Sequence, residues 1–120
     1  MKIAAIIPVK TFSLAKTRLS LSTKQKEDLC KIMLEEIVYT LSISPHIYKT
    51  IIVTKEKGAI EIGRKYNAIS IIDNDEKNVN SAIALADKYL LENEFDASII
   101  FPQDIPYIKT QDIDFILNYM

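Results

Sequence analysis

Three cationic side chains follow an apolar segment near the start of the chain. Residues 3–7 read Ile-Ala-Ala-Ile-Ile, Pro8 follows them, and Lys10, Lys16 and Arg18 come shortly after. Because proline cannot donate to a central ladder of a sheet, a strand over residues 3–7 should end at Pro8. The carboxyl edge of parallel strands is where open α/β sheets bind their ligands. Three fixed cations at that edge predict an anion site, and a phosphate chain is the small anion that suits them best. The alternative is plain surface charge.

A second candidate is the carboxylate of Asp104, which lies just past another apolar segment. The sequence there is Phe-Pro-Gln-Asp-Ile-Pro over residues 101–106, so two prolines stiffen the backbone around the carboxylate. Mg²⁺ takes one or two carboxylates together with phosphate oxygens and water. Asp104 is therefore a candidate Mg²⁺ ligand, and a metal beside the cations predicts a nucleoside triphosphate site. The alternative is that Asp104 caps a turn before Pro106, as Asp often does.

The other reactive residue types predict no site. His46 is the single histidine and stands beside Pro45 in a predicted turn, while Cys30, the single cysteine, is expected to be an inert thiol in a helix. The acidic residues at 73, 75 and 76 lack the spacing of a calcium loop, so we expect them to be solvated. With Gly58 and Gly63 as its two glycines, the chain contains neither a Walker A loop nor a dinucleotide fingerprint.

Strand and helix patterns alternate along the chain. The predicted elements determine where the candidate site residues lie. Apolar runs predict strands at residues 3–7, 50–54, 69–72 and 97–101. Helical spacing predicts helices from a cap at Ser22 or Thr23 to about residue 42, over about 57–66, from a cap near Asn80 or Ser81, and after Thr110. The apolar stripe expected on the first helix consists of Leu29, Ile32, Met33, Ile37 and Leu41.

This alternation predicts a three-layer α/β/α fold with a mostly parallel, Rossmann-like sheet. The 120 residues are enough for one domain, residues 1–120, with a real core. A doubly wound sheet usually has five or more strands, so we expect a domain that is incomplete at its carboxyl terminus. The apolar runs are too short for a transmembrane helix, and Pro8 and Lys10 interrupt any signal-peptide core. A single cysteine fits a reducing compartment, so we expect a cytoplasmic protein.

The net charge of −1 hides a strong asymmetry along the chain. Residues 1–31 carry seven Lys and Arg against two acids, whereas residues 73–120 carry three Lys against ten acids. A basic third could indicate a nucleic-acid-binding face. Phe12 is the one aromatic residue among those basic residues, and nucleic-acid stacking needs several. We therefore expect no nucleic acid and no membrane among the partners.

Several of these motifs together resemble a known family. Ile-Pro-Val-Lys at residues 7–10, Ala-Lys-Thr-Arg-Leu at 15–19, the Asn-containing helix start around Asn80, and Pro-Gln-Asp-Ile-Pro at 102–106 are similar to motifs of the 2-phospho-L-lactate guanylyltransferases. That family has the nucleotide-diphospho-sugar transferase type of fold, which is also seen in molybdenum-cofactor guanylyltransferase. The resemblance covers residues 3–22 and 78–108.

The resemblance implies transfer of GMP from GTP to 2-phospho-L-lactate or phosphoenolpyruvate, with release of pyrophosphate, in coenzyme F-420 biosynthesis. Nucleotide binding would then fall to Pro8, Val9, Lys10, Lys16, Arg18 and Asn80. Lys10, Lys16 and Arg18 would also stabilise the leaving pyrophosphate, and Asp104 would bind Mg²⁺.

Two alternatives stay open. The first is a related nucleotidyltransferase with another nucleotide or acceptor. The second is an inactive nucleotide-binding or interaction remnant, because relatives of this family are longer. An open sheet edge would favour self-association as a homodimer.

Overall fold

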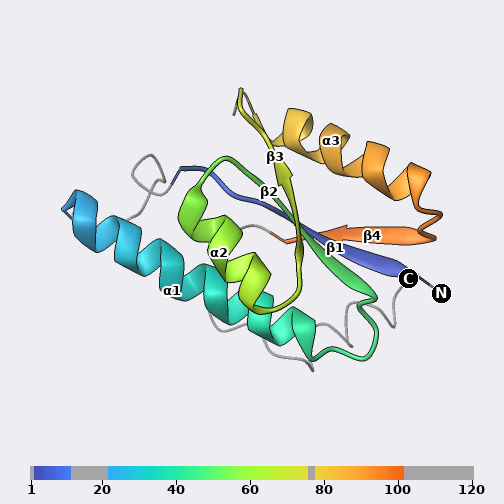
Figure 1. Cartoon of the computed structure of the whole chain (residues 1–120), viewed down its shortest axis with the longest axis horizontal. Coiled ribbons are helices and arrows are strands. Elements are labelled where there is room, and N and C mark those ends of the chain that lie inside the picture. The colour runs from blue at the N-terminus through green and yellow to red at the C-terminus, as the bar shows by residue number, and fades with distance from the viewer. Residues whose placement is uncertain (1, 12–21, 76–77, 102–120) are drawn as a thin grey trace.

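A computed structural model describes residues 2–11, 22–75 and 78–101. These residues form four strands and three helices in strict alternation (Figure 1). The elements are β1 (Ile3–Pro8), α1 (Thr23–Ser42), β2 (Lys49–Thr54), α2 (Lys57–Lys65), β3 (Ile69–Ile72), α3 (Val79–Glu92) and β4 (Ala97–Ile100). The predicted strands agree with these bounds to within one residue at each end. The predicted helix after Thr110 lies outside the described residues.

The four strands form one parallel sheet in the order β3-β2-β1-β4. Ile6 in the centre of β1 is aligned with Ile51 of β2 on one side and with Ile100 of β4 on the other. The chain builds outward from β1 to β3 and then crosses back to place β4 on the far side of β1. The direction in which strands are added therefore reverses between β1 and β4. The predicted parallel, Rossmann-like sheet is confirmed.

Helices cover both faces of the sheet, with α1 and α2 on one side and α3 on the other (Figure 1). Alternate residues of the strands accordingly belong to two separate cores. One core joins Ala5, Ile7 and Ile52 with residues of α1 and α2, and the other joins Ala4, Ile6, Ile51 and Val53 with Ala82, Ala86 and Leu90 of α3. Burial on both faces explains why β1 and β2 are apolar without alternation.

Helix α1 begins at the predicted cap. The Ser22 hydroxyl accepts a hydrogen bond from the Gln25 backbone N–H at 3.2 Å, and the Gln25 side chain accepts from the Ser22 N–H at 3.0 Å. The predicted apolar stripe is wrong at Ile32, which is 64% exposed. The face that packs on the sheet contains Cys30, Leu34, Ile37, Val38 and Leu41. Ile32 lies two residues from both Cys30 and Leu34, which places it on the opposite side of the helix.

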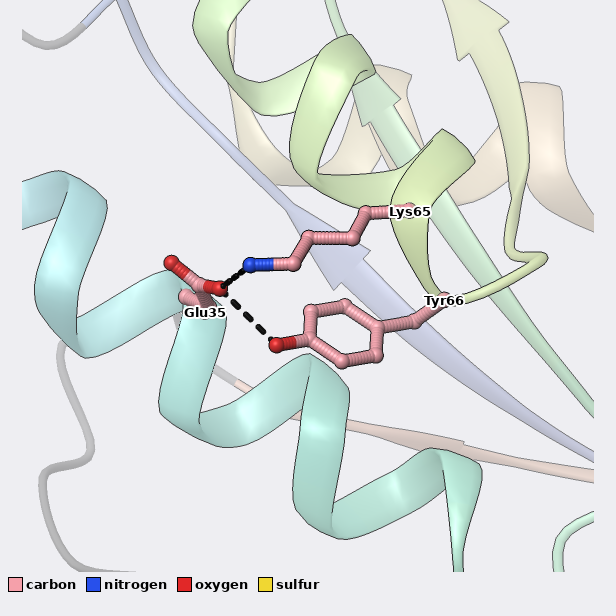
Figure 2. Close-up of polar contacts among 3 residues, drawn as sticks. All are labelled: Glu35, Lys65 and Tyr66. Atoms are coloured by element: carbon pink, nitrogen blue, oxygen red, sulfur yellow. Dashed lines mark hydrogen bonds and ion pairs between the residues drawn. The ribbon is translucent and has the colours of Figure 1, made fainter.

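A polar contact ties α1 to α2 (Figure 2). The Lys65 ammonium and the Tyr66 hydroxyl both donate to Glu35 Oε1, at 2.6 and 2.8 Å. The Tyr66 ring also meets the ring of Tyr39 edge-on, with the centroids 5.8 Å apart. This cluster holds the two helices of one layer together and is structural.

Lys2 lies at the amino edge of the sheet, at the opposite end from the carboxyl ends of the strands. Its ammonium donates to the Asn93 carbonyl at 2.9 Å and lies over the rings of Tyr48 and Phe95, 4.9 and 4.7 Å from their centroids. The Lys2 backbone N–H donates to the Asp96 carboxylate. These contacts join β1 to the segments that precede β2 and β4. Among the described residues, no helix has the length and apolar character needed to cross a membrane.

Candidate functional site

The carboxyl ends of the parallel strands lie at one edge of the sheet, and the ladder continues past them. The Val9 N–H donates to the Val53 carbonyl at 2.9 Å, and the Asp73 N–H donates to the Thr54 carbonyl at 3.0 Å. The Phe101 N–H likewise donates to the Ile6 carbonyl at 2.9 Å. The first residue after β1, β3 and β4 is therefore held by the sheet itself.

A pocket lies at this edge, between the sheet and the start of α3. It is lined by Pro8, Val9, Lys10, Val53, Asp73, Asn78 and Ala82. Its walls are mostly apolar, and the ammonium of Lys10, the carboxylate of Asp73 and the amide of Asn78 supply its polar groups. An apolar cavity with a few convergent polar groups is the usual form of a small-molecule site.

The structure brings together three of the residues predicted to bind a nucleotide. Pro8, Val9 and Lys10 all line the pocket; Val9 is buried and Lys10 is exposed. Asn80 is exposed in the first turn of α3 and does not line this pocket. The predicted site residues Lys16, Arg18 and Asp104 lie outside the described residues.

The start of α3 differs from the prediction. Its cap is Asn78, whose backbone is extended and whose side-chain oxygen accepts from the Ser81 N–H at 2.8 Å. The predicted caps, Asn80 and Ser81, lie within the helix instead. Asn78 itself could have located the start of α3, because asparagine is a favoured cap residue. The side chain of a cap residue accepts a hydrogen bond from the backbone N–H of the third helical residue, which is Ser81 here. The correct cap brings the amino end of α3, which carries a partial positive charge, to the pocket.

Asp73 is a charged pocket residue that sequence reasoning missed. We expected a solvated carboxylate, but the residue is only 7% exposed and lines the pocket. The reason is its position directly after β3, where the ladder to Thr54 holds it against the sheet. The same argument that selected Asp104, a carboxylate just past a buried strand, could have selected Asp73.

Within the described part of the chain, no group of three or more His, Cys, Asp or Glu side chains could hold a metal ion. Such a group is not what Mg²⁺ beside phosphates requires, because one or two carboxylates suffice when phosphate oxygens and water complete the shell. Among the described residues that line the pocket, Asp73 supplies one carboxylate.

The fold is similar to that of known protein structures. The structure superimposes on one from Desulfovibrio desulfuricans assigned to the nucleotide-diphospho-sugar transferases, with a TM-score of 0.73 and 15% identity over 98% of this chain and 54% of that one. At this identity the likeness concerns the fold, and it confirms the predicted fold type.

Sequence relatives are closer. The chain is 32% identical, over 99% of its length, to the 2-phospho-L-lactate guanylyltransferase of Methanothermobacter thermautotrophicus, of which it covers 53%. It is 29% identical, over 96% of its length, to phosphoenolpyruvate guanylyltransferase 2 of Rhodococcus jostii, of which it covers 51%. The chain thus spans about half the length of these relatives.

The family model described as "Guanylyl transferase CofC like" matches residues 3–120, which is nearly the whole chain. The match includes β1, the pocket and every predicted site residue. The protein therefore belongs to the guanylyl transferase CofC-like family.

Proposed function

We propose that residues 1–120 form the nucleotide-binding part of a cytoplasmic guanylyltransferase. It would transfer GMP from GTP to 2-phospho-L-lactate or phosphoenolpyruvate, with release of pyrophosphate, in coenzyme F-420 biosynthesis. The observation that carries the proposal is the pocket at the carboxyl edge, with Lys10 in its wall, in a chain of this family. The names of the two relatives supply the two candidate acceptors.

The position of Lys10 fits a role in binding the triphosphate. It follows β1 directly after Val9, beside the point where the strand order reverses, which is where open α/β sheets bind ligands. A lysine contact with a phosphate oxygen contributes about 1.5–3 kcal/mol. Lys16 and Arg18 follow within the next eight residues of the sequence, and we assign them to the same phosphates.

Asp104 follows β4 by four residues in the sequence, and we assign it to Mg²⁺. The metal would neutralise charge on the phosphates when bound. Asn80, in the first turn of α3, remains a candidate for contact with the nucleotide. The acceptor phosphate would attack the α-phosphate of GTP directly, so this reaction needs no side-chain nucleophile.

The test is to measure pyrophosphate release and GTP binding in the same preparation, with Mg²⁺ and each acceptor in turn. We expect release that needs GTP, Mg²⁺ and one of the acceptors, with Lys10→Ala and Asp104→Ala both lowering it at least about tenfold. Lys31→Ala, which removes an exposed cation from α1, is the matched control and should leave release unchanged.

The measurements of GTP binding and of pyrophosphate release test donor binding and group transfer separately. GTP binding without pyrophosphate release would contradict transfer by this chain and leave a donor-binding half. No GTP binding would overturn the proposal as a whole, and undiminished release by Asp104→Ala would overturn the role of that carboxylate.

A further inference from the structure

The outer edge of β3 is a candidate interaction surface. The strand order makes β3 an outer strand, and within the described residues it pairs with β2 alone (Figure 1). It reads Ile-Ser-Ile-Ile over residues 69–72, without a charged residue or a proline. Natural sheets commonly protect such an edge with lysine, proline or a bulge, because an uncovered apolar edge pairs readily with another strand. The β3 strand contains neither of those two residue types.

The ladder to β2 determines which backbone groups of β3 face outward. In a parallel pair of strands, alternate residues direct both their N–H and their C=O to the same neighbour. The Asp73 N–H donates to the Thr54 carbonyl of β2, so the residues two and four positions before it also face β2. The Ala68 N–H belongs to the alternate set and donates to a carbonyl of α2 instead. Ser70 and Ile72 therefore direct their backbone donors and acceptors to the outer edge.

The two ends of β3 carry opposite charges. Arg64 is an exposed cation in the last turn of α2, and it lines a groove with Asn67 and Ser70 beside the amino end of β3. Asp75 is exposed just past the carboxyl end of β3. A second copy of the strand, laid antiparallel along the first, brings the carboxyl end of each strand to the amino end of the other. A cation then meets a carboxylate at both ends of the strand pair.

One register satisfies the backbone groups and the charges together. If Ser70 of one copy lies opposite Ile72 of the other, the outward N–H and C=O groups of both residues pair across the edge. Asp75 of one copy is then level with Asn67 of the other, which lines the same groove as Arg64. The contact is isologous, since the same patch serves on both copies. It joins the two four-stranded sheets into one continuous sheet.

We propose that the outer edge of β3 is a homodimer interface, in which the β3 strands of two copies pair antiparallel. The occupant is a second copy because the charges at the two ends of β3 complement each other in that arrangement. The interface does not depend on the proposed function. The carboxyl edges of the two sheets point in opposite directions, so each copy keeps its own pocket. A single strand pair buries little surface, and the dimer should therefore be weak and depend on protein concentration.

A charge exchange measured by sedimentation velocity tests the proposal. The wild type should change from monomer to dimer over about a hundredfold range of protein concentration. Arg64→Glu and Asp75→Arg should each weaken dimerisation at least about tenfold, because each places like charges at both ends of the strand pair. An equimolar mixture of the two variants should recover the affinity of the wild-type dimer, since opposite charges then meet again. Both side chains are exposed, so the variants should keep the fold.

Lys31→Glu is the matched control, because it reverses an exposed cation of α1 and should leave dimerisation unchanged. Amide hydrogen exchange gives a second measurement. Exchange at Ser70 and Ile72 should slow as the protein concentration rises, while exchange at Ile71, whose N–H faces β2, should not change. A wild type that stays monomeric throughout would overturn the proposal. A dimer that neither charge variant weakens, or a mixture that does not recover the dimer, would also overturn it.

Discussion

A single carboxylate oxygen, Oε1 of Glu35, accepts hydrogen bonds from both Lys65 and Tyr66. The Lys65 hydrogen bond, and after it the Tyr66 hydrogen bond, lowers the pKa of Glu35. A carboxylate with a lowered pKa stabilises the fold fully above its unfolded-state pKa, and this stabilisation is lost as the pH falls through the folded-state pKa. The hydrogen bonds to Glu35 raise the pKa of Lys65 and the pKa of Tyr66. The stabilisation that these two groups contribute is therefore lost only as the pH rises through their raised pKa values.

Glu35→Gln should therefore lower the free energy of unfolding at pH 7 and have less effect in acid. The difference from the wild type should shrink as the pH falls below about 4.3, the ordinary pKa of glutamate. Urea unfolding of both proteins at a series of pH values measures this difference in the free energy of unfolding. The side chains of Lys65 and Glu35 are 63% and 39% exposed, so the effect should be small and decrease with added salt.

Glu61→Gln is the matched control for this series. Glu61 is an exposed carboxylate of α2, and its replacement should not reproduce the pH dependence. A Glu35→Gln difference that stayed constant from pH 7 to pH 3 would show that the contact with Lys65 and Tyr66 contributes nothing through ionisation.

The residues of the pocket were predictable to different degrees. Pro8, Val9 and Lys10 could be placed because proline marks the end of β1 and the following residues have to lie at the sheet edge. Asp73 was misjudged because its neighbours Asn74 and Asp75 are polar and exposed, so the segment has the composition of a solvated loop. Burial of Asp73 depends on its bond to Thr54, a tertiary contact that composition does not show.

Gly63 determines how closely α2 packs on the sheet. A Cβ at this position would lie 2.9 Å from Ile52 Cδ1 and 3.3 Å from Ser70 Oγ, in β2 and β3. Ile52 is fully buried, so its side chain has little room to move away. The absence of a side chain at Gly63 therefore allows α2 to lie directly against the two strands.

Gly63→Ala should destabilise the fold although alanine is the better helix former. Overpacking of a core costs about 1–3 kcal/mol, and the gain in helix propensity is up to about 1 kcal/mol. Ile52→Val removes the crowded Cδ1 atom and alone should cost about 0.5–1.5 kcal/mol.

A double-mutant cycle measured by chemical unfolding separates these effects. We expect Ile52→Val to cost less in the Gly63→Ala background than in the wild type, because there it also relieves the clash. Additive free energies would mean that Gly63 does not limit the approach of α2 to Ile52.

The strands were more predictable than the faces of the helices. Four apolar runs between turn residues predicted β1 to β4, and burial on both faces makes β1 and β2 continuously apolar. The apolar stripe of α1 was misplaced at Ile32 because an exposed isoleucine has the same chemistry as a buried one. Which side of a helix faces the sheet depends on where the strands lie, and that is a property of the whole fold.

At the scale of the whole molecule, the two ends of the sheet have different roles. At the amino edge, the Lys2 ammonium contacts the Asn93 carbonyl and the rings of Tyr48 and Phe95. The carboxyl edge carries the pocket with Lys10 and Asp73. A nucleotide that binds this chain should therefore affect one end of the sheet and leave the other unchanged.

The proposed position of GTP is tested most directly by a two-dimensional ¹⁵N NMR titration of the chain with GTP and Mg²⁺. We predict saturable shifts of the backbone amide signals of Val9, Lys10 and Asp73, while those of Tyr48 and Phe95 stay unchanged. ATP at the same concentrations should produce much smaller shifts, because the proposed donor nucleotide is GTP. Shifts centred on the amino edge, or no saturable shift with GTP, would contradict a guanine nucleotide site at the carboxyl ends of β1, β2 and β3.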